Sequence, residues 1–268
     1  MTQSTSAKLG HETFVAMTYN LWGDMAPEVR TPSLRRFMRL RPPDLLAIQE
    51  LRRWSRDVID EALDGHARVH SDDEVGWERQ SNLWWRTSMF EYLEHGAEDA
   101  GILDEHARLF WVRLRFVHEP ESIIVFSTAH LTWPGHAVER GNGVNLRTPQ
   151  AARITEHLAR IGGDAPVIFT VDINDIAGPN WAFGNAGYLD SFSALHQHSP
   201  VTHPVVPNLL ADGIGTGMSP LASPRKAIDW LFHRGQLTVR SSEVAEFFDR
   251  GIAPSDHWPV AATYTLAG

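Results

Sequence analysis

Polar side chains that can do acid–base or metal chemistry lie at the ends of several short apolar runs. Asn20, Glu50 and His130 each lie at the end of one run, and a fourth run ends with Asp172 and Asn174. Each residue alone has a capping or turn role as its ordinary explanation. Open sheets of α/β proteins collect ligand-binding groups at their strand ends, so the joint placement of these residues favours one shared site.

The stretch APSDHWPVAATYTL, residues 253–266, raises the same possibility near the end of the chain. Asp256 and His257 stand directly before an alternating apolar strand pattern. Successive side chains of a strand point to opposite faces, so this pair belongs to a loop or strand end. Asp229 lies inside the apolar segment AIDWLF. A buried carboxylate needs a charged or donating partner, and a histidine from a neighbouring strand end would serve.

A sheet with flanking helices must position these residues. Segments of strand length, rich in β-branched and aromatic residues, are found at 14–20, 44–50, 109–116, 122–131, 165–174 and 227–234. The apolar spacing in 34–38 predicts one helix, and the spacing in 146–161 predicts a second helix that Gly162 and Gly163 end. Gly and Pro cluster at 134–149 and 199–224, where we expect long loops.

The composition predicts one domain over 12–268, preceded by a polar, mobile lead-in at 1–11. A chain of 268 residues with 43% hydrophobic residues can fill a large core. The formal net charge of -9 argues against tight, non-specific binding of nucleic acid or anionic membranes. No apolar run approaches the ~18 residues of a membrane span, and no signal peptide is recognisable, so we expect a cytoplasmic protein.

Cysteine is absent, which excludes disulfides and cysteine nucleophiles. Any metal site must therefore rest on oxygen and imidazole ligands. Oxygen ligands favour Mg²⁺, with Mn²⁺ or Ca²⁺ as alternatives. A serine hydrolase finds no support either, because the chain has no G-x-S-x-G elbow.

Six motifs follow one another along the chain: TYNLW, LLAIQE, STAHL, VDIND, AIDWLF and PSDHWPV. In order and spacing, over residues 13–266, they resemble the motif series of the endonuclease/exonuclease/phosphatase superfamily, the deoxyribonuclease-I-like phosphoesterases. The resemblance implies a four-layer α/β sandwich, with two mixed β-sheets packed face to face and helices on the outside. It also implies a Mg²⁺-dependent hydrolase of phosphate monoesters or diesters, which acts by in-line attack of an activated water.

The resemblance also implies a role for each motif residue. Glu50 is the main ligand of the Mg²⁺ ion, with Asn20 beside it and Asp256 as a further or indirectly bound carboxylate. Asp172 and Asn174 position the attacking water and a phosphoryl oxygen. A hard dication neutralises the charge of the phosphate, and a carboxylate orients or deprotonates the water.

Histidines complete the implied site. His257 contacts the scissile phosphate while Asp229 holds its ring, and His130 acts near the leaving group. An imidazolium donates to phosphate oxygens, and an aspartate partner fixes its tautomer and favours its cationic form. Glu78 is interpreted as the carboxylate partner of His130, with an exposed strand residue as the alternative; Asn82 resembles an asparagine that other relatives carry.

The fourth motif departs from the family pattern. VDIND stands where G-D-F-N is usual, so that Val171 replaces a glycine and Ile173 a phenylalanine. Both replacements are apolar, which preserves the strand, but the valine can alter how closely the backbone approaches the metal or the water. Asp175 is interpreted as a solvated turn carboxylate, with a place in the metal site as the alternative.

Further residues have two interpretations each. Trp133 and Trp181 fall in loops beside catalytic motifs and are the candidates for substrate contact. Arg147 opens the helix after the His130 loop and either binds substrate or forms a helix-terminal salt bridge. RRWSR at 52–56 is a local basic patch, which either steers phosphates toward the site or is ordinary surface charge. Other aromatic residues of strand patterns are predicted to be core: Trp84, Trp85, Trp111 and Trp230. The histidines of 196–224 are interpreted as surface residues: His196, His198 and His203.

The loops at 131–149 and 175–187 offer an apolar and aromatic rim with few cations: Trp133, Trp181, Phe183, Arg140 and Arg147. This composition favours a small-molecule or lipid phosphoesterase. A DNA or RNA nuclease of the same superfamily is the alternative. A catalytically silent binding module is a remote alternative, because such relatives lose a metal-binding or water-positioning residue and all of these residues are present.

Overall fold

The strands and helices predicted from the sequence are all present, but the predicted loop at 134–149 contains the helix Ala137–Asn142 and the start of the helix Arg147–Gly162. The protein is described by a computed structural model over residues 12–71, 74–206 and 225–266. The predicted lead-in at 1–11, and residues 207–224 of the predicted loop, lie outside the described residues. Each of the six predicted strand segments is a strand, namely β1, β2, β6, β7, β8 and β10.

The first sheet has the strand order β11-β12-β1-β2-β4-β3. Within it β1 and β2 run parallel, and every other neighbouring pair is antiparallel. Its bounds are β1 (Thr13–Asn20), β2 (Leu45–Gln49), β3 (His66–Arg68), β4 (Ser81–Arg86), β11 (Leu237–Val244) and β12 (Val260–Leu266).

The second sheet has the strand order β5-β6-β7-β8-β10-β9. Here β7 and β8 run parallel and the other pairs are antiparallel. Its bounds are β5 (Phe90–Glu98), β6 (Leu109–Phe116), β7 (Ile123–His130), β8 (Val167–Asp172), β9 (Leu189–Asp190) and β10 (Asp229–Arg234).

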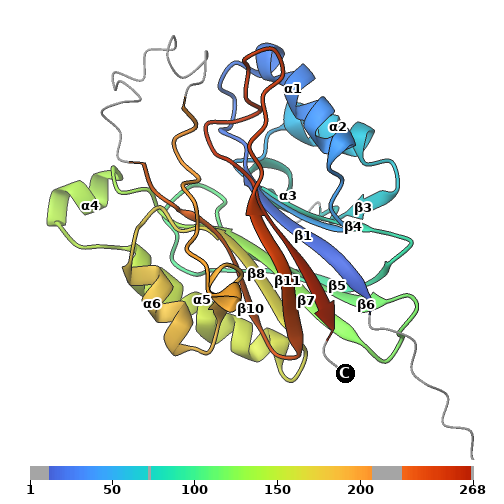
Figure 1. Cartoon of the computed structure of the whole chain (residues 1–268). Coiled ribbons are helices and arrows are strands. Elements are labelled where there is room, and N and C mark those ends of the chain that lie inside the picture. Colours follow the sequence, from blue (N-terminus) through green and yellow to red (C-terminus); the bar gives the residue numbers. More distant parts are fainter. Residues whose placement is uncertain (1–11, 72–73, 207–224, 267–268) are drawn as a thin grey trace, which may run out of the picture.

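Helices cover the outer face of each sheet, with α1 and α2 over the first sheet and α5 and α6 over the second (Figure 1). The helices are α1 (Pro27–Leu40), α2 (Arg53–Ala62), α3 (Gly76–Arg79), α4 (Ala137–Asn142), α5 (Arg147–Gly162) and α6 (Gly178–Asn185), with a 3₁₀ turn η1 (Ser193–Leu195). The two predicted helices correspond to α1 and α5. No helix in the described ranges is long and apolar enough to cross a bilayer.

The alternation of strand side chains produces three apolar layers. In β1, Phe14 and Ala16 face the core between the two sheets, whereas Met17 and Tyr19 face the layer beneath α1 and α2. A corresponding layer packs α5 and α6 against the second sheet. Side chains of period two thus bury both faces of each sheet. The predicted four-layer α/β sandwich is confirmed.

The same topology brings the polar strand ends together. In the two parallel pairs, Asn20 lies opposite Gln49 and His130 lies opposite Asp172, so each pair ends on the same side. The antiparallel neighbour β10 begins there, with Asp229 opposite Asp172. β12 likewise runs antiparallel to β1, so the segment before its first residue returns to this edge. One end of the sandwich therefore collects residues from both sheets.

Candidate active site

A buried aspartate–histidine pair lies at the centre of this edge. Nδ1 of His257 donates to the two carboxylate oxygens of Asp229 at 2.9 and 3.1 Å. Burial alone would lower the pKa of His257, but the carboxylates of Asp229 and Asp256 outweigh it and raise that pKa to about 10. The ring is therefore an imidazolium at neutral pH, and its Nε2 lies 3.9 Å from Oδ2 of Asp172.

Asp172 joins the two sheets. Its Oδ2 accepts from Nδ2 of Asn20 at 2.9 Å, and its Oδ1 accepts from the backbone N–H of Asn174 at 2.9 Å. Nε2 of His130 lies 3.5 Å from Oδ2. Burial, with a further contribution from Asp229, raises the pKa of Asp172 above its usual range. A carboxylate of raised pKa suits the acceptance of a proton from water.

Asn174 and His130 contact each other directly. Nδ2 of Asn174 lies 2.9 Å from Nε2 of His130, and it also donates to the backbone oxygen of Leu131 at 3.0 Å. The backbone of Asn174 has φ of 48°, in the left-handed region that non-glycine residues seldom occupy. Such strain at a side chain that faces a polar cluster is typical of functional positions.

Glu50 occupies a similar backbone conformation, with φ of 52° directly after β2. Its Oε1 accepts from Nδ2 of Asn20 at 3.1 Å and lies 4.0 Å from Nε2 of His130. Its Oε2 accepts no hydrogen bond from the described residues. The carboxylate is 30% exposed, so this oxygen has lone pairs available to a cation at an accessible position.

The donor set fits a hard divalent cation, since carboxylate oxygens are the ligands such ions prefer. Oδ1 of Asn20 accepts from the backbone N–H of Trp22 at 3.0 Å. Nδ2 of the same amide donates to Glu50 and to Asp172, so in this structure the amide links these two carboxylates and its oxygen faces the backbone. Burial alone would raise the pKa of Asp256, but His257 and His203 beside it lower it, which keeps this carboxylate ionised.

Arg30 supports the site from beneath, and no sequence pattern pointed to it. This fully buried guanidinium of α1 donates to the backbone oxygens of Leu21 at 2.6 Å and Pro254 at 2.8 Å, and to those of Met25 and Gly23. It therefore fastens the loop after Asn20 to the loop that carries Asp256. Burial lowers its pKa to about 10, which leaves it charged at neutral pH.

Gln49 is a second residue without a sequence signal. Its side chain is fully buried, and Nε2 donates to Oγ1 of Thr18 at 2.9 Å and to Oγ1 of Thr128 at 2.7 Å. The last of these bonds joins β2 to β7 and hence one sheet to the other. An unpaired amide at this depth would be costly, so the bond fixes how the two sheets align beneath the site.

The structure does not bring Glu78 to His130. Glu78 lies in the short helix α3, where its carboxylate accepts from Arg56 at 2.5 Å and from Arg68 at 2.7 Å. The carboxylate of Glu78 is bound by two arginines and not by His130. The interpretation of Glu78 as the partner of His130 is therefore wrong. Asn82 is buried and bonds the backbone of Val69 and Trp77, which makes it a structural residue.

Arg147 is committed to other protein groups. Its guanidinium donates to both carboxylate oxygens of Glu139 at 2.6 Å, to Asp175 at 3.0 Å and to the backbone oxygen of Thr132 at 3.0 Å. The side chain is only 4% exposed, so it offers no donor to a substrate. The helix-terminal salt bridge is the interpretation that the structure supports. Asp175, at 13% exposure, is a partner in it rather than a solvated turn residue.

The loops after β7 and β8 do expose apolar residues. Trp181 is 77% exposed, Ile176 71% and Trp133 49%. The Trp133 ring lies over Gly135, where an added Cβ would stand 1.6 Å from it, so only glycine permits this position. Phe183, in contrast, is buried against Phe169 and is not part of the rim.

The remaining predictions, for tryptophans and histidines, are confirmed in part. Burial of the strand tryptophans is confirmed for Trp84, Trp85 and Trp111, while Trp230 is half-buried. His196 and His198 are exposed as predicted. His203 is different, since its ring packs against that of His257 at a centroid distance of 4.5 Å. Its interpretation as a surface residue is wrong.

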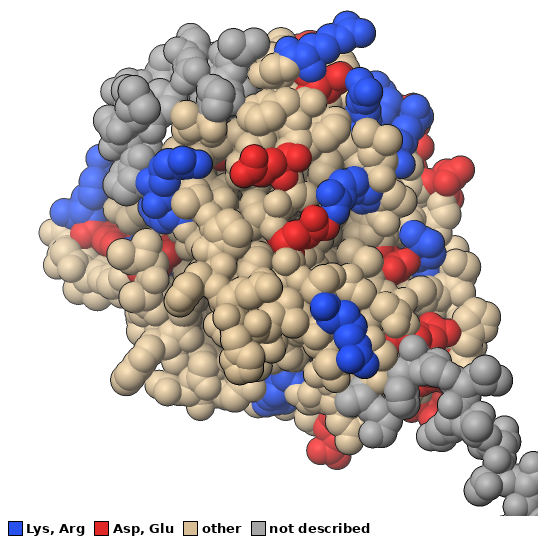
Figure 2. Space-filling view, viewed as in Figure 1, with Lys and Arg blue, Asp and Glu red and all other residues tan. Residues whose placement is uncertain are grey.

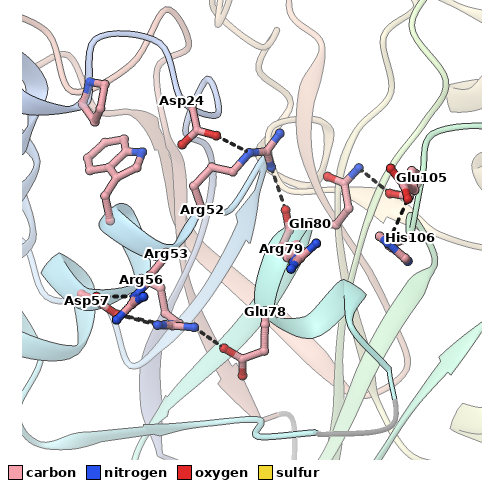
Figure 3. Close-up of a pocket in the computed structure, with 12 residues that line it drawn as sticks. Asp24, Arg52, Arg53, Arg56, Asp57, Glu78, Arg79, Gln80, Glu105 and His106 are labelled. Carbon is pink, nitrogen blue, oxygen red and sulfur yellow. Dashed lines mark hydrogen bonds and ion pairs between the residues drawn. The ribbon is translucent and has the colours of Figure 1, made fainter.

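A groove of about 1000 Å³ adjoins the site on the side of α2 and α3 (Figure 3). An added Cβ at Gly23 would lie near both Glu50 and Arg52, which places the groove wall beside Glu50. Four arginines line it, together with four carboxylates: Arg52, Arg53, Arg56 and Arg79; Asp24, Asp57, Glu78 and Glu105. Arg52, Arg53 and Arg56 are each paired with lining carboxylates, although Arg53 is 87% exposed. The predicted basic patch is thus largely neutralised.

Solved structures share this fold. TDP2 of D. rerio, in complex with a single strand DNA product, is 20% identical with a TM-score of 0.75, over 95% of this chain and 99% of its own. An endonuclease/exonuclease/phosphatase family protein of Bacteroides thetaiotaomicron is 17% identical with a TM-score of 0.73, over 96% of this chain and 98% of its own.

The mannosyl-6-phosphatase Bt3783 of Bacteroides thetaiotaomicron VPI-5482 is 16% identical with a TM-score of 0.72, over 94% of this chain and 100% of its own. The comparison with curated proteins gave no match. The model of the Endonuclease/Exonuclease/phosphatase family matches residues 17–257, a span that runs from within β1 to His257 and includes all of the polar strand ends, while β12 follows it. The chain therefore belongs to the endonuclease/exonuclease/phosphatase family and is a metal-dependent phosphoric ester hydrolase.

Proposed function

We propose that this enzyme hydrolyses a phosphate ester that carries a compact organic or lipid group, with Mg²⁺ as its metal. The observation that carries the proposal is the exposed apolar rim of Trp133, Ile176 and Trp181. Trp133 closely follows His130 in the chain, Ile176 closely follows Asp172, and Trp181 lies in the helix after Ile176, so the rim begins within a few residues of the polar centre. Exposed aromatic side chains at the mouth of a polar site suit an apolar substituent better than a second phosphate.

In this proposal Glu50 and Asp256 would hold the metal, with Asn20 beside Glu50, and the charge of the metal would offset that of the phosphate. Asp172 and Asn174 orient the attacking water, and the proton that the water loses passes to the Asp172 carboxylate. His257 donates through Nε2 to a phosphate oxygen while Asp229 fixes its ring. A bond forms between water oxygen and phosphorus, the ester bond opposite it breaks, and His130 protonates the departing oxygen.

A second candidate is the hydrolysis of a phosphodiester at a nucleic acid strand. The arginine-lined groove beside Glu50 favours it, because guanidinium groups bind phosphates along a strand. TDP2 of D. rerio, with a related fold, is described in complex with single strand DNA. Against it, on the face drawn in Figure 2 Lys and Arg are interspersed with Asp and Glu and form no broad basic patch.

A substrate panel tests the proposal. kcat/KM is measured with Mg²⁺ on duplex and single-stranded DNA, RNA, sphingomyelin, sugar phosphates and inositol phosphates, at ~50 and ~200 mM salt. We expect the highest value on a small or lipid ester and a weak dependence on salt. Efficient cleavage of nucleic acid that falls steeply with salt, with nothing comparable on the small esters, would make the second candidate correct.

A further inference from the structure

His203 is anchored to both halves of the aspartate–histidine centre. Its N–H donates to the backbone oxygen of Lys226 at 3.0 Å, and its own oxygen accepts from Lys226 at 2.9 Å. On the other side, Val205 N–H donates to the oxygen of Asp256 at 2.8 Å and Trp258 N–H to that of Thr202 at 2.8 Å. The segment that carries His203 therefore lies between the start of β10 and the Asp256–His257 turn, held to each by backbone bonds.

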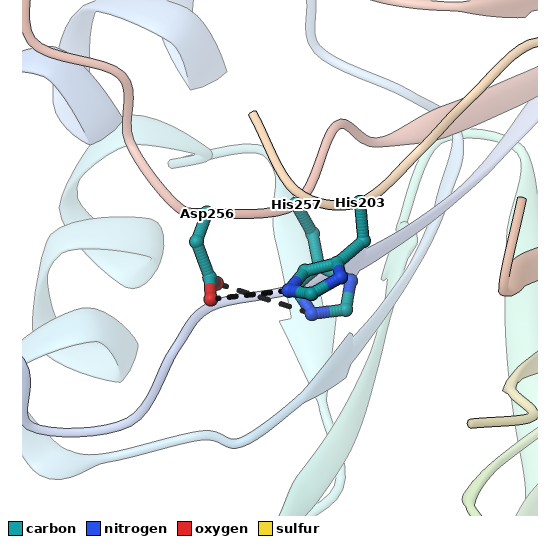
Figure 4. A group of neighbouring side chains, drawn as sticks. All are labelled: His203, Asp256 and His257. Atoms are coloured by element: carbon teal, nitrogen blue, oxygen red, sulfur yellow. Dashed lines mark ion pairs between the residues drawn. The ribbon is translucent and has the colours of Figure 1, made fainter. Parts of the chain in front are cut away.

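The side chain of His203 faces the same centre (Figure 4). Its Nε2 lies 3.6 Å from Oδ2 of Asp256, and its ring lies on that of His257 with a tilt of 40°. The other oxygen of Asp256, Oδ1, lies 3.9 Å from Nε2 of His257. One carboxylate thus faces two imidazoles that pack on each other, of which only His257 is held by a second carboxylate.

We propose that His203 is a positioning residue that holds Asp256 away from the phosphate-binding nitrogen of His257. The inference rests on the proposed roles of Asp256 and His257. A carboxylate 3.9 Å from an imidazolium nitrogen can close this gap by a small side-chain rotation and would then occupy the donor that the phosphate needs. An N–H of His203 directed at Oδ2 gives Asp256 a competing partner for its other oxygen, so Nε2 of His257 stays available.

The three side chains can also be read as a metal site, since one possible ligand atom from each lies within 4.8 Å of the others. The second nitrogen of His203 argues against this. A histidine that ligates a metal donates its other N–H to an acceptor. Nδ1 of His203 is buried without a hydrogen bond from the described residues. With the ring proton on Nε2, directed at Asp256, Nδ1 carries no proton and needs no acceptor. The role of a donor to Asp256 therefore fits His203 better than the role of a metal ligand.

Two substitutions separate the donor from the ring. His203→Gln keeps an N–H donor near the position of Nε2, whereas His203→Phe keeps an aromatic ring against His257 without a donor. The matched control is His198→Phe, an exposed histidine of the same segment with no described contact. His203→Leu is a second donor-free variant should the phenylalanine variant fail to fold. Folding of each is checked by its melting temperature in EDTA.

We expect His203→Phe to lower kcat/KM about tenfold and to weaken inhibition by inorganic phosphate by a similar factor, while His203→Gln stays within about threefold of the parent. In an Asp256→Asn background the loss caused by His203→Phe should shrink to about twofold or less, because the carboxylate it restrains is gone. The affinity for Mn²⁺ by calorimetry should fall with His203→Phe and not with His203→Gln. The control should match the parent throughout.

Three results would overturn the inference. The first is a glutamine variant as impaired as the phenylalanine variant, which would assign the effect to ring shape. The second is full additivity with Asp256→Asn. The third is Zn²⁺ binding that depends on His203, which would make the cluster a metal site. Calorimetry with Mn²⁺ needs no substrate, so a wrong substrate class would leave that result standing and the two failures can be told apart.

Discussion

At the scale of single residues, the charge of His257 depends on its partners. Burial acts to remove that charge, and three carboxylates act to keep it: Asp229, Asp256 and Asp172. Asp229 is the one that bonds Nδ1 directly. The pair therefore sets both the orientation of the ring and the pH range over which the ring is an imidazolium.

Asp229→Asn should lower the pKa of His257 and reduce turnover by a factor on the order of 10². The alkaline limb of the pH profile of kcat/KM should move to lower pH, because the imidazolium loses its proton earlier. The profile of the parent and the variant, each with the same metal concentration, checks this. An unchanged profile together with an unchanged rate would make the pair purely structural.

The same shift has a consequence for stability, measured in EDTA as the free energy of unfolding. The folded-state pKa of His257, about 10, exceeds the ordinary value of 6.5. The stabilisation is therefore complete below pH 6.5 and is lost as the pH rises from 6.5 toward 10. Asp229→Asn should flatten this part of the stability profile.

At the scale of elements, buried polar side chains connect loops that the sequence leaves far apart. Arg30 joins the loop after β1 to the loop before β12 through carbonyl oxygens, and it has no carboxylate partner in these bonds. The guanidinium rests near the indole of Trp54, at 4.8 Å from the ring centroid. Loss of this side chain would leave several buried carbonyl groups without donors.

Arg30→Met should therefore lower the free energy of unfolding by about 3 kcal/mol or more, and reduce turnover by disturbing both loops. Arg36→Met is the matched control on the same helix, since Arg36 is 62% exposed and pairs with Asp249 at the surface. It should cost less than about 1 kcal/mol. Urea denaturation of both variants measures the difference, and equal losses would contradict the assigned role of Arg30.

The elements themselves were predictable because their signals are local. Each of the six predicted strands is an apolar run of its own, and Asn20, Glu50, His130 and Asp172 stand where those runs end, so the sequence indicated these strands and their polar ends. The strands β3, β5, β9 and β11 were not predicted, because short or mixed polar segments carry no such signal. Pairings between distant residues carry no such signal. The bond from Arg30 to Pro254 joins residues 224 positions apart.

The wrong predictions have the same origin. Glu78 lies close along the chain to several charged residues, and its choice of Arg56 and Arg68 over His130 depends on the fold of α3. His203 stands in a stretch without any metal-ligand spacing, and its place beside His257 follows only from the backbone bonds of its segment. Local composition could not indicate either arrangement.

At the scale of the whole molecule, the site joins the two sheets. Asn20 of the first sheet donates to Asp172 of the second, and Gln49 of the first sheet likewise donates to Thr128 of the second. A ligand that binds residues of both sheets stabilises their association as well as its own position. Metal binding should therefore be visible in the unfolding of the entire chain.

Mg²⁺ at about 100 times its dissociation constant should add about 2.7 kcal/mol to the free energy of unfolding and raise the melting temperature relative to EDTA. Glu50→Gln should abolish both this response and turnover, while its melting temperature in EDTA stays near that of the parent. Glu91→Gln, an exposed carboxylate paired with Arg115, is the control and should respond like the parent. A normal Mg²⁺ response in Glu50→Gln would remove Glu50 from the metal site.

The order of the strands also determines when the active site can be completed during synthesis of the chain. All strands of the second sheet, β5 to β10, lie between the first four strands of the other sheet and its last two. During synthesis, Asn20 and Glu50 leave the ribosome early, but the turn with Asp256 and His257 emerges after both sheets have otherwise been made. On the proposed roles of Asp256 and His257, we expect a growing chain to be inactive toward phosphate esters until β12 pairs with β1.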